Sequence, residues 1–225
     1  MRRFNLPLRP AVVNPPGGRR PDGQAIAARA AALRDDLEVR TAPVLLSLGR
    51  LVARKGFDRV LRSAAVLRAR FPGLAVIVAG DGPERKPLES LARDLGLEQS
   101  VRMTGAVDEL TKWALYDLCD LFVMPNRLLG GADWEGFGIV FVEAALASRA
   151  VVGGRNGGVP DAVEEGVTGV LVDPEDQAAL TSAIEHLLAD DGLRGRMGRA
   201  GKDRARTRFS GEVVAREFRS QLGWA

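Results

Sequence analysis

Short apolar runs alternate with longer amphipathic stretches along most of the chain. Short apolar runs predict buried strands, and apolar residues at helical spacing predict helices. Strands are expected at 44–48, 74–79, 101–103, 121–124, 151–152 and 170–172. Helices are expected at 57–70, 84–95, 109–118, 137–147, 176–189, 192–208 and 211–221, with a helical turn at 159–165.

Strands that alternate with helices indicate βαβ units, whose parallel sheet is covered by helices on both faces. We therefore predict an α/β fold, a Rossmann-like doubly wound parallel sheet. Ligands of such sheets bind beyond the carboxyl ends of the strands, where the strand order reverses. Each motif described below follows a predicted strand, which favours one shared site at that edge.

The first forty residues differ from the rest. Proline and glycine are dense over 7–23, which predicts a loop or linker, and 24–39 is alanine-rich with helical spacing. We expect 1–40 to be the remnant of an interdomain linker with a helix, and 41–225 to be one α/β domain with C-terminal helices.

Composition narrows the class of protein. The chain has 225 residues, 46% hydrophobic and 27% charged, which is ordinary for a soluble globular domain. The net charge of +3 is too small to predict nucleic-acid binding, and no apolar run reaches membrane-spanning length. Without a signal-peptide pattern at its start, the chain is expected to be cytoplasmic. Cys119, the single cysteine, lies in an apolar run and is expected to be a buried structural thiol.

The segment GRLVARKG (49–56) follows the first predicted strand of the domain. Gly49 allows a close backbone approach to a ligand, Arg50 offers a planar fork for phosphate oxygens, and Lys55 adds a mobile positive charge. Two cations beside a diphosphate would stabilise the charge that grows on it as a glycosidic bond breaks. A solvated basic loop is the alternative interpretation.

The segment GDGP follows the next predicted strand. Gly80 and Asp81 could approach a ligand through backbone groups, but a purely structural turn explains the same residues equally well.

The segment GGADWEGFGIVFVEA (130–144) carries most information. Its glycines precede a predicted helix, whose free amide groups and dipole favour an anion. Glu135 could accept hydrogen bonds from sugar hydroxyls. Glu143 lies within an apolar helix, where a carboxylate is costly unless it is exposed or hydrogen-bonded. A ribose diol would satisfy it, and a solvent-facing position is the alternative.

Asp133 and Glu135 also form a D-x-E pair, which resembles a divalent-metal motif. The chain has one histidine, and this loop holds no further carboxylates. Because Arg50 and Lys55 could stabilise the leaving group themselves, we expect neither a metal nor another cofactor.

Taken in order, GRLVARKG, VAGDGP, RMTGAVDELTK, EGFGIVFVE and GGVPDAVEEGVTGVLVDPED resemble the C-terminal domain of the retaining glycosyltransferases of family four, which have the two-Rossmann GT-B architecture. The resemblance runs from about residue 43 to the C-terminus. It implies that the chain is the donor-binding half of an enzyme that transfers a sugar from a nucleoside-diphosphate sugar to an acceptor hydroxyl. The family's N-terminal acceptor domain has no counterpart here, so the fragment alone is expected to be inactive.

The resemblance also implies residue roles. Arg50 and Lys55 match the diphosphate-binding pair, while Glu135 and Glu143 match the family's E-x7-E, the first on the donor sugar and the second on the ribose. Val107 matches the position whose backbone meets the base, with Lys112 along the same edge, and Gly136, Phe137 and Gly138 match backbone donors to the sugar and distal phosphate. The other residues expected to bind the donor are Gly49, Gly80, Asp81 and Ile139.

The segment MPNRLLGGADWEGFGIVFVEA is similar to bacterial mannosyltransferases that build phosphatidylinositol mannosides from GDP-mannose. This implies GDP-mannose as donor, with a UDP-sugar as the alternative, and peripheral membrane association of the intact enzyme. Two other classes compete. A non-catalytic nucleotide-binding module would bind nucleotide without transfer. A nicotinamide-dependent oxidoreductase would need G-x-G-x-x-G after the first strand, where Gly49 is instead followed by Arg50 and Leu51.

Overall fold

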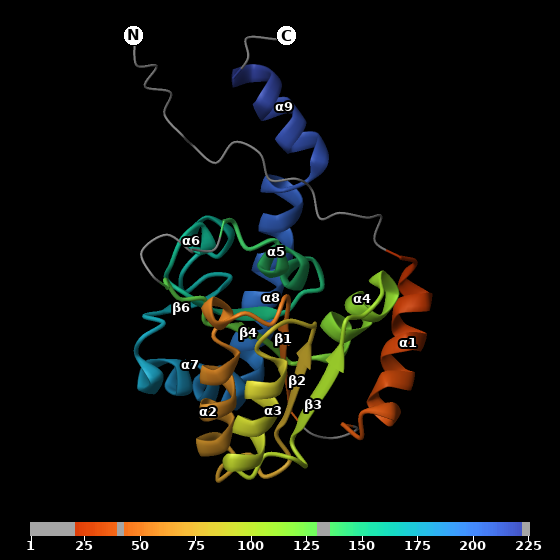
Figure 1. Ribbon diagram of the computed structural model, residues 1–225. Helices are drawn as coiled ribbons and strands as arrows, with labels where there is room; N and C mark the ends of the chain where they lie inside the picture. Colours follow the sequence, from red (N-terminus) through yellow and green to blue (C-terminus); the bar gives the residue numbers. More distant parts are fainter. Residues whose placement is uncertain (1–20, 40–42, 130–135, 222–225) are drawn as a thin grey trace.

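Six parallel strands form the central sheet of the computed structural model, which describes residues 21–39, 43–129 and 136–221 (Figure 1). The strands are β1 (Val44–Leu48), β2 (Ala75–Ala79), β3 (Val101–Gly105), β4 (Leu121–Met124), β5 (Ala150–Gly154) and β6 (Gly169–Val172). β1, β2, β4 and β5 are buried along their whole length, because helices cover both faces of the sheet. The predicted α/β fold is confirmed.

The strand order is β3-β2-β1-β4-β5-β6, so the chain builds outward from β1 in one direction and then returns to add β4 on the other side. β1 pairs in parallel with both β2 and β4. The strand order therefore reverses between β1 and β4, and the loops that follow these two strands flank the reversal point. In a doubly wound sheet this is where a ligand is expected.

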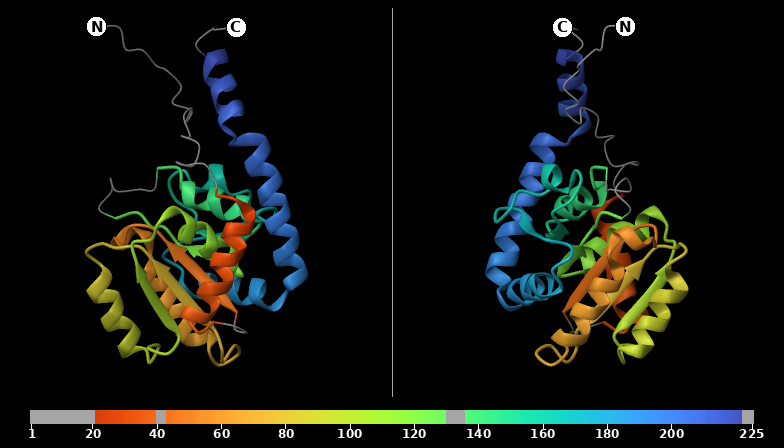
Figure 2. Two further views of the ribbon diagram at one scale, coloured as in Figure 1. Left: turned by 90° about the vertical axis from the view of Figure 1, so that its right-hand side faces the viewer. Right: turned by 60° about the vertical axis from the view of Figure 1, so that its left-hand side comes forward.

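The helices divide between the two faces of the sheet, as right-handed crossovers in opposite directions require (Figures 1 and 2). One face carries α2 (Phe57–Leu67), α3 (Arg85–Asp94) and α7 (Gln177–Ala189). The other carries α1 (Gly23–Asp36), α4 (Glu109–Leu118), α5 (Ile139–Leu146) and α8 (Asp191–Arg208). A 3-10 turn, η1 (Ala53–Lys55), and a short helix, α6 (Val159–Ala162), lie in loops after β1 and β5.

The first described helix, α1, packs along α4 (Figure 1). Ile26, Ala30 and Leu33 are buried in the same core as the sheet. The Arg34 guanidinium donates a hydrogen bond of 2.9 Å to the carbonyl of Leu118 at the end of α4. The helix predicted over 24–39 is thus a packed part of this core, while the proposed domain boundary at residue 40 stays a prediction.

The last described helix, α9 (Gly211–Gln221), continues beyond α8 and extends away from the sheet (Figure 2). Within the described ranges, no helix combines the length and apolarity needed to span a bilayer.

Candidate functional site

Three loops lie against one another at the carboxyl edge of the sheet. The Gly49 amide donates to the Ala79 carbonyl (2.9 Å), and the Gly80 amide donates to the Gly105 carbonyl (2.8 Å). A Cβ atom on Gly80 would lie 1.9 Å from the Gly49 carbonyl oxygen. Only glycine permits this approach, so the predicted site residues Gly49 and Gly80 are in backbone contact.

The turn after β2 supports the loop after β1. The Leu51 amide donates to the Asp81 carbonyl (2.9 Å), and the Glu84 amide donates to the Leu51 carbonyl (3.0 Å). The exposed Asp81 side chain accepts a hydrogen bond of 2.7 Å from the amide of Gly82. The contacts of Asp81 are those of the structural turn that the sequence left open as the alternative.

Arg50 and Lys55, the predicted diphosphate pair, have contrasting surroundings. Arg50 is exposed, and its guanidinium makes no hydrogen bond or ion pair with another described residue. Lys55, in η1, is only 8% exposed. A Cβ atom on Gly49 would lie 4.0 Å from Lys55 Cε and 3.7 Å from Met124 Cε, so the lysine lies beside the ends of β1 and β4. The alternative interpretation, a solvated basic loop, therefore fits Arg50 but does not fit Lys55.

The predicted anion-binding helix, α5, begins at Ile139 rather than at residue 137. Gly138 has a left-handed backbone (φ 78°) that does not continue a helix, which explains the later start. Gly136 is exposed, and the ring of Phe137 packs edge-to-face against Phe209 at a centroid distance of 5.3 Å. The amides of the first turn of α5 thus follow directly on the loop from β4, while Glu135 lies outside the described residues.

Glu143, on the second turn of α5, is buried with 4% exposure. The solvent-facing alternative is therefore wrong. Its Oε1 accepts a hydrogen bond of 2.7 Å from Lys112 Nζ, and its Oε2 accepts one of 3.0 Å from the Tyr116 hydroxyl. Both donors come from α4, so the cost of burying this carboxylate is offset by a cation and a phenol within the protein.

Lys112 is held between two carboxylates. Its ammonium lies 2.7 Å from Glu143 and 3.0 Å from Glu109, which in turn accepts a hydrogen bond of 2.8 Å from the Trp113 indole. Burial lowers the pKa of Lys112, but the hydrogen bonds that it donates to Glu143 and Glu109, together with the charges of these two carboxylates, outweigh burial and raise the pKa above its ordinary value. Val107, half-buried in the loop after β3, precedes the residue that caps α4.

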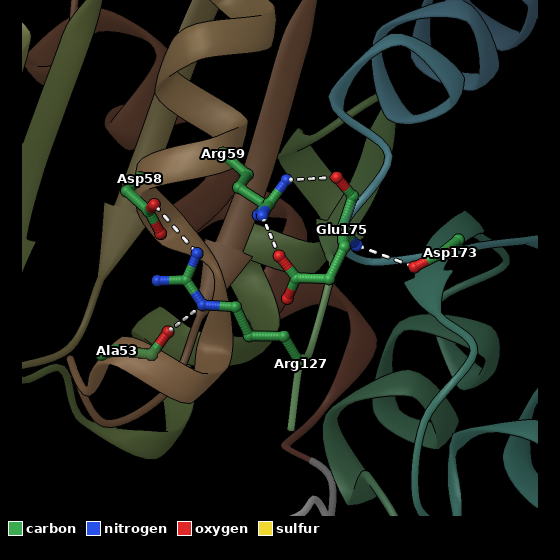
Figure 3. A network of polar contacts seen from close by, with 6 residues as sticks. All are labelled: Ala53, Asp58, Arg59, Arg127, Asp173 and Glu175. Atoms are coloured by element: carbon green, nitrogen blue, oxygen red, sulfur yellow. Dashed lines mark hydrogen bonds and ion pairs between the residues drawn. The ribbon is translucent and has the colours of Figure 1, made fainter. Parts of the chain in front are cut away.

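Tyr116 and Arg127 are polar residues of this region that the sequence reasoning missed. Tyr116 lies one helical turn after Lys112, so it shares a face of α4 with it. Arg127 follows β4 and donates hydrogen bonds to the Ala53 carbonyl and the Asp58 carboxylate, from Nε and Nη1 respectively, both at 3.1 Å (Figure 3). The sequence alone does not indicate that residue 127 contacts residues 53 and 58, because these contacts depend on the strand order of the folded sheet.

Other candidate chemistry is weak. Cys119 is fully buried, which raises the pKa of its thiol to about 12, as expected of a structural rather than a nucleophilic cysteine. Over the described part of the chain, no three His, Cys, Asp or Glu side chains gather in a way that could hold a metal ion.

Tyr116 gives a direct test of this buried network, because it is the only tyrosine in the chain. Burial, and then the charge of Glu143, raise the pKa of Tyr116 well above its ordinary value of 10.0. The unfolded chain therefore loses this proton first, and the contribution to stability falls as the pH rises past about 10. In an alkaline titration, tyrosinate absorbance should rise only as circular dichroism reports unfolding. Ionisation with a midpoint near 10 in the folded chain would contradict the buried contact.

A doubly wound parallel sheet with a buried lysine at its reversal point and a buried carboxylate on α5 defines a Rossmann-like α/β domain with a candidate anion site. The model of the family described as "Glycosyl transferases group 1" matches residues 30–204. The chain belongs to this family.

Two curated relatives are both named GDP-mannose-dependent alpha-(1-6)-phosphatidylinositol monomannoside mannosyltransferase. The one from Mycolicibacterium smegmatis is 40% identical over 173 residues, covering 76% of this chain and 45% of the relative. The one from Mycobacterium tuberculosis is 37% identical over 188 residues, covering 82% of this chain and 48% of the relative. The chain thus spans about half the length of the curated relatives it matches.

Solved structures agree. The Anabaena protein HepE in complex with UDP superposes with a TM-score of 0.77 at 26% identity, covering 87% of this chain and 52% of HepE. The C-terminal domain of the group 1 family glycosyl transferase LpcC from Francisella tularensis shares the fold at 22% identity (TM-score 0.67), covering 79% of this chain and 93% of that domain. The predicted fold, one half of a GT-B glycosyltransferase, is confirmed.

Proposed function

We propose that this chain is the donor-binding half of a retaining, metal-independent glycosyltransferase, which holds a nucleoside-diphosphate sugar at the carboxyl edge of its sheet. The observation that carries the proposal is the buried position of Lys55 beside the ends of β1 and β4, where the strand order reverses. A cation in that position is suited to a diphosphate.

The placement of the described groups supports the following proposed roles. Lys55, with the exposed Arg50, stabilises the negative charge that develops on the diphosphate as its bond to the sugar breaks. The first amides of α5 donate to the distal phosphate and sugar. Glu143, oriented by Lys112 and Tyr116, accepts hydrogen bonds from the ribose diol with its remaining lone pairs. Glu135 lies outside the described residues, and its proposed role as the partner of the donor sugar rests on the sequence alone.

GDP-mannose is the proposed donor, and a UDP-sugar is the alternative. The mannosyltransferase names of the relatives support the first, and a second HepE structure, with UDP-glucose, supports the second. The acceptor would be bound by a further domain, which agrees with a match that covers only 45% and 48% of the two relatives. The whole protein is proposed to work in the cytoplasm with peripheral membrane association, in keeping with the phosphatidylinositol acceptor named for the relatives.

Calorimetric titration of the chain with GDP, UDP and ADP in excess EDTA tests this function. One nucleoside diphosphate should bind without metal, and Lys55→Ala should weaken it about tenfold or more, since a hydrogen bond to a charged group contributes about 1.5–3 kcal/mol. Lys202→Ala on α8 is the matched control and should bind like the wild type.

The remaining outcomes separate the alternatives. No binding by any of the three nucleotides would overturn donor binding by this chain. Binding without donor hydrolysis or transfer, even after the acceptor half of a relative is supplied, would instead favour the non-catalytic nucleotide-binding module.

A further inference from the structure

We propose that Arg127 is a positioning residue that fixes the turn carrying Lys55, and so sets the grip on the donor diphosphate. The inference rests on the proposed function of Lys55. Arg127 follows β4, whereas Lys55 follows β1, on the other side of the point where the strand order reverses. We propose no contact between Arg127 and the ligand, so its effect on binding would be transmitted through the turn.

Arg127 joins the loop after β4 to the turn after β1 and to the start of α2 through three hydrogen bonds, of which Figure 3 shows the two made by its side chain. Its backbone amide donates to the Arg54 carbonyl at 2.8 Å. Its Nε donates to the Ala53 carbonyl and its Nη1 to Asp58 Oδ2, both at 3.1 Å. With its side chain 16% exposed, the guanidinium makes these bonds partly shielded from water, where charged hydrogen bonds are stronger.

The Ala53 carbonyl, which accepts the hydrogen bond from Arg127 Nε, also closes the turn. The Ala53 carbonyl also accepts the Gly56 amide at 3.2 Å. Gly56 has a left-handed backbone (φ 71°), and a Cβ atom there would lie 2.4 Å from the Pro125 carbonyl oxygen. The turn is therefore pressed against the chain leaving β4 at one end and bound by Arg127 at the other, with Lys55 between these points.

Such fixation matters because lysine is a flexible point charge, whose side chain loses about 2 kcal/mol of rotamer entropy when it is held. If the backbone of the turn is already fixed, fewer conformations of Lys55 are lost when the diphosphate binds, and the affinity is higher. Asp58 contributes by holding the guanidinium plane at the start of α2, which follows the turn directly.

Arg59 offers a matched control in the same view (Figure 3). It lies next to Asp58, its side chain is 15% exposed, and it binds the backbone carbonyl and the carboxylate of Glu175, so it makes the same kinds of contact as Arg127. Its partner Glu175 lies just before α7, whereas Ala53, a partner of Arg127, lies in η1. Arg59→Met should therefore lower stability as Arg127→Met does, without altering diphosphate binding.

The experiment measures the affinity of the chain for GDP and GMP, or for UDP and UMP if uridine nucleotides bind. We expect Arg127→Met to weaken the diphosphate about tenfold and the monophosphate less than twofold, and Arg59→Met to change neither by more than twofold. Arg127→Lys keeps the charge but cannot make both side-chain bonds, so it should resemble Arg127→Met. Equal losses for Arg59→Met, or full affinity in Arg127→Met, would overturn the proposal.

A double-mutant cycle distinguishes positioning from direct phosphate contact. If Arg127 acts through Lys55, Arg127→Met should weaken binding by less than twofold once Lys55→Ala is present. If Arg127 contacts phosphate itself, the tenfold loss persists in the Lys55→Ala background and the positioning role is wrong.

Amide hydrogen exchange gives a readout that needs no ligand. The Gly56 amide, which donates to the Ala53 carbonyl, should exchange at least tenfold faster in Arg127→Met than in Arg59→Met when the two are compared at equal global stability. Equal rates would refute the positioning role. If the wild-type chain bound no nucleotide, the proposed function would fail, and the exchange result would still decide whether Arg127 holds the turn.

Discussion

Replacing Gly80 with alanine is expected to lower the free energy of unfolding by about 3 kcal/mol, since backbone strain and overpacking each cost about 1–3 kcal/mol. Gly80 has a φ of 134°, and an added Cβ would lie 1.9 Å from the Gly49 carbonyl oxygen. The obstacle is backbone and not a movable side chain, so the loops after β1 and β2 must separate. Because Gly49 lies beside Lys55, nucleotide binding should be lost with stability.

Urea unfolding followed by circular dichroism measures the effect on stability. Gly23→Ala is the matched control: apart from its chain neighbours and the backbone of its own helix, no described atom lies within 4 Å of its added Cβ, and its helical position should accept alanine with no loss. A Gly80→Ala chain as stable as the wild type would mean that the two loops are not in the backbone contact described here.

The fold could be predicted from the sequence because its strands are buried on both faces. Fully buried parallel strands are continuous apolar runs, so β1 and β4 were found with their observed bounds. Element ends were less visible. The start of α5 depends on the left-handed backbone of Gly138. β5 extends to Gly154 because Gly153 and Gly154 pair with Leu171 and Val172 of β6, which the local sequence does not show.

The candidate site was predictable in its residue types but not in its contacts. Glycine and charged residues near the strand ends suggested that Lys55 and Glu143 belong to one edge. The apolar neighbours of Glu143 favoured its burial, but nothing local indicated that Lys55 is buried. The partners of Glu143 lie on another helix, with Lys112 separated from it by 31 positions. Pairings of this kind depend on how two helices pack, which periodicity within each helix does not determine.

The pair formed by Lys112 and Glu143 allows the fold and the proposed function to be separated. Lys112→Met alone should lower the free energy of unfolding by about 2 kcal/mol at neutral pH, because it leaves the Glu143 carboxylate buried with Tyr116 as its remaining recorded donor. Breaking a fully buried pair costs about 3–5 kcal/mol, and the smaller value reflects the 16% exposure of the lysine side chain.

The double variant Lys112→Met/Glu143→Leu should recover most of that loss, because it removes both charges and leaves apolar side chains of similar volume. Its free energy of unfolding is expected to lie within about 1 kcal/mol of the wild type. Its affinity for the nucleoside diphosphate should nevertheless fall at least tenfold, since the acceptor proposed for the ribose diol is gone.

Urea unfolding and calorimetric titration of the same three proteins give the two readouts. A double variant no more stable than Lys112→Met would show that the pair does not act as a unit, and that the loss in the single variant comes from packing of the lysine stem. A stable double variant that bound nucleotide like the wild type would remove Glu143 from the proposed site and leave it a purely structural carboxylate. Recovered stability with lost affinity is the combination that supports the proposal, because it shows that the fold tolerates removal of the whole charge pair while nucleotide binding requires Glu143.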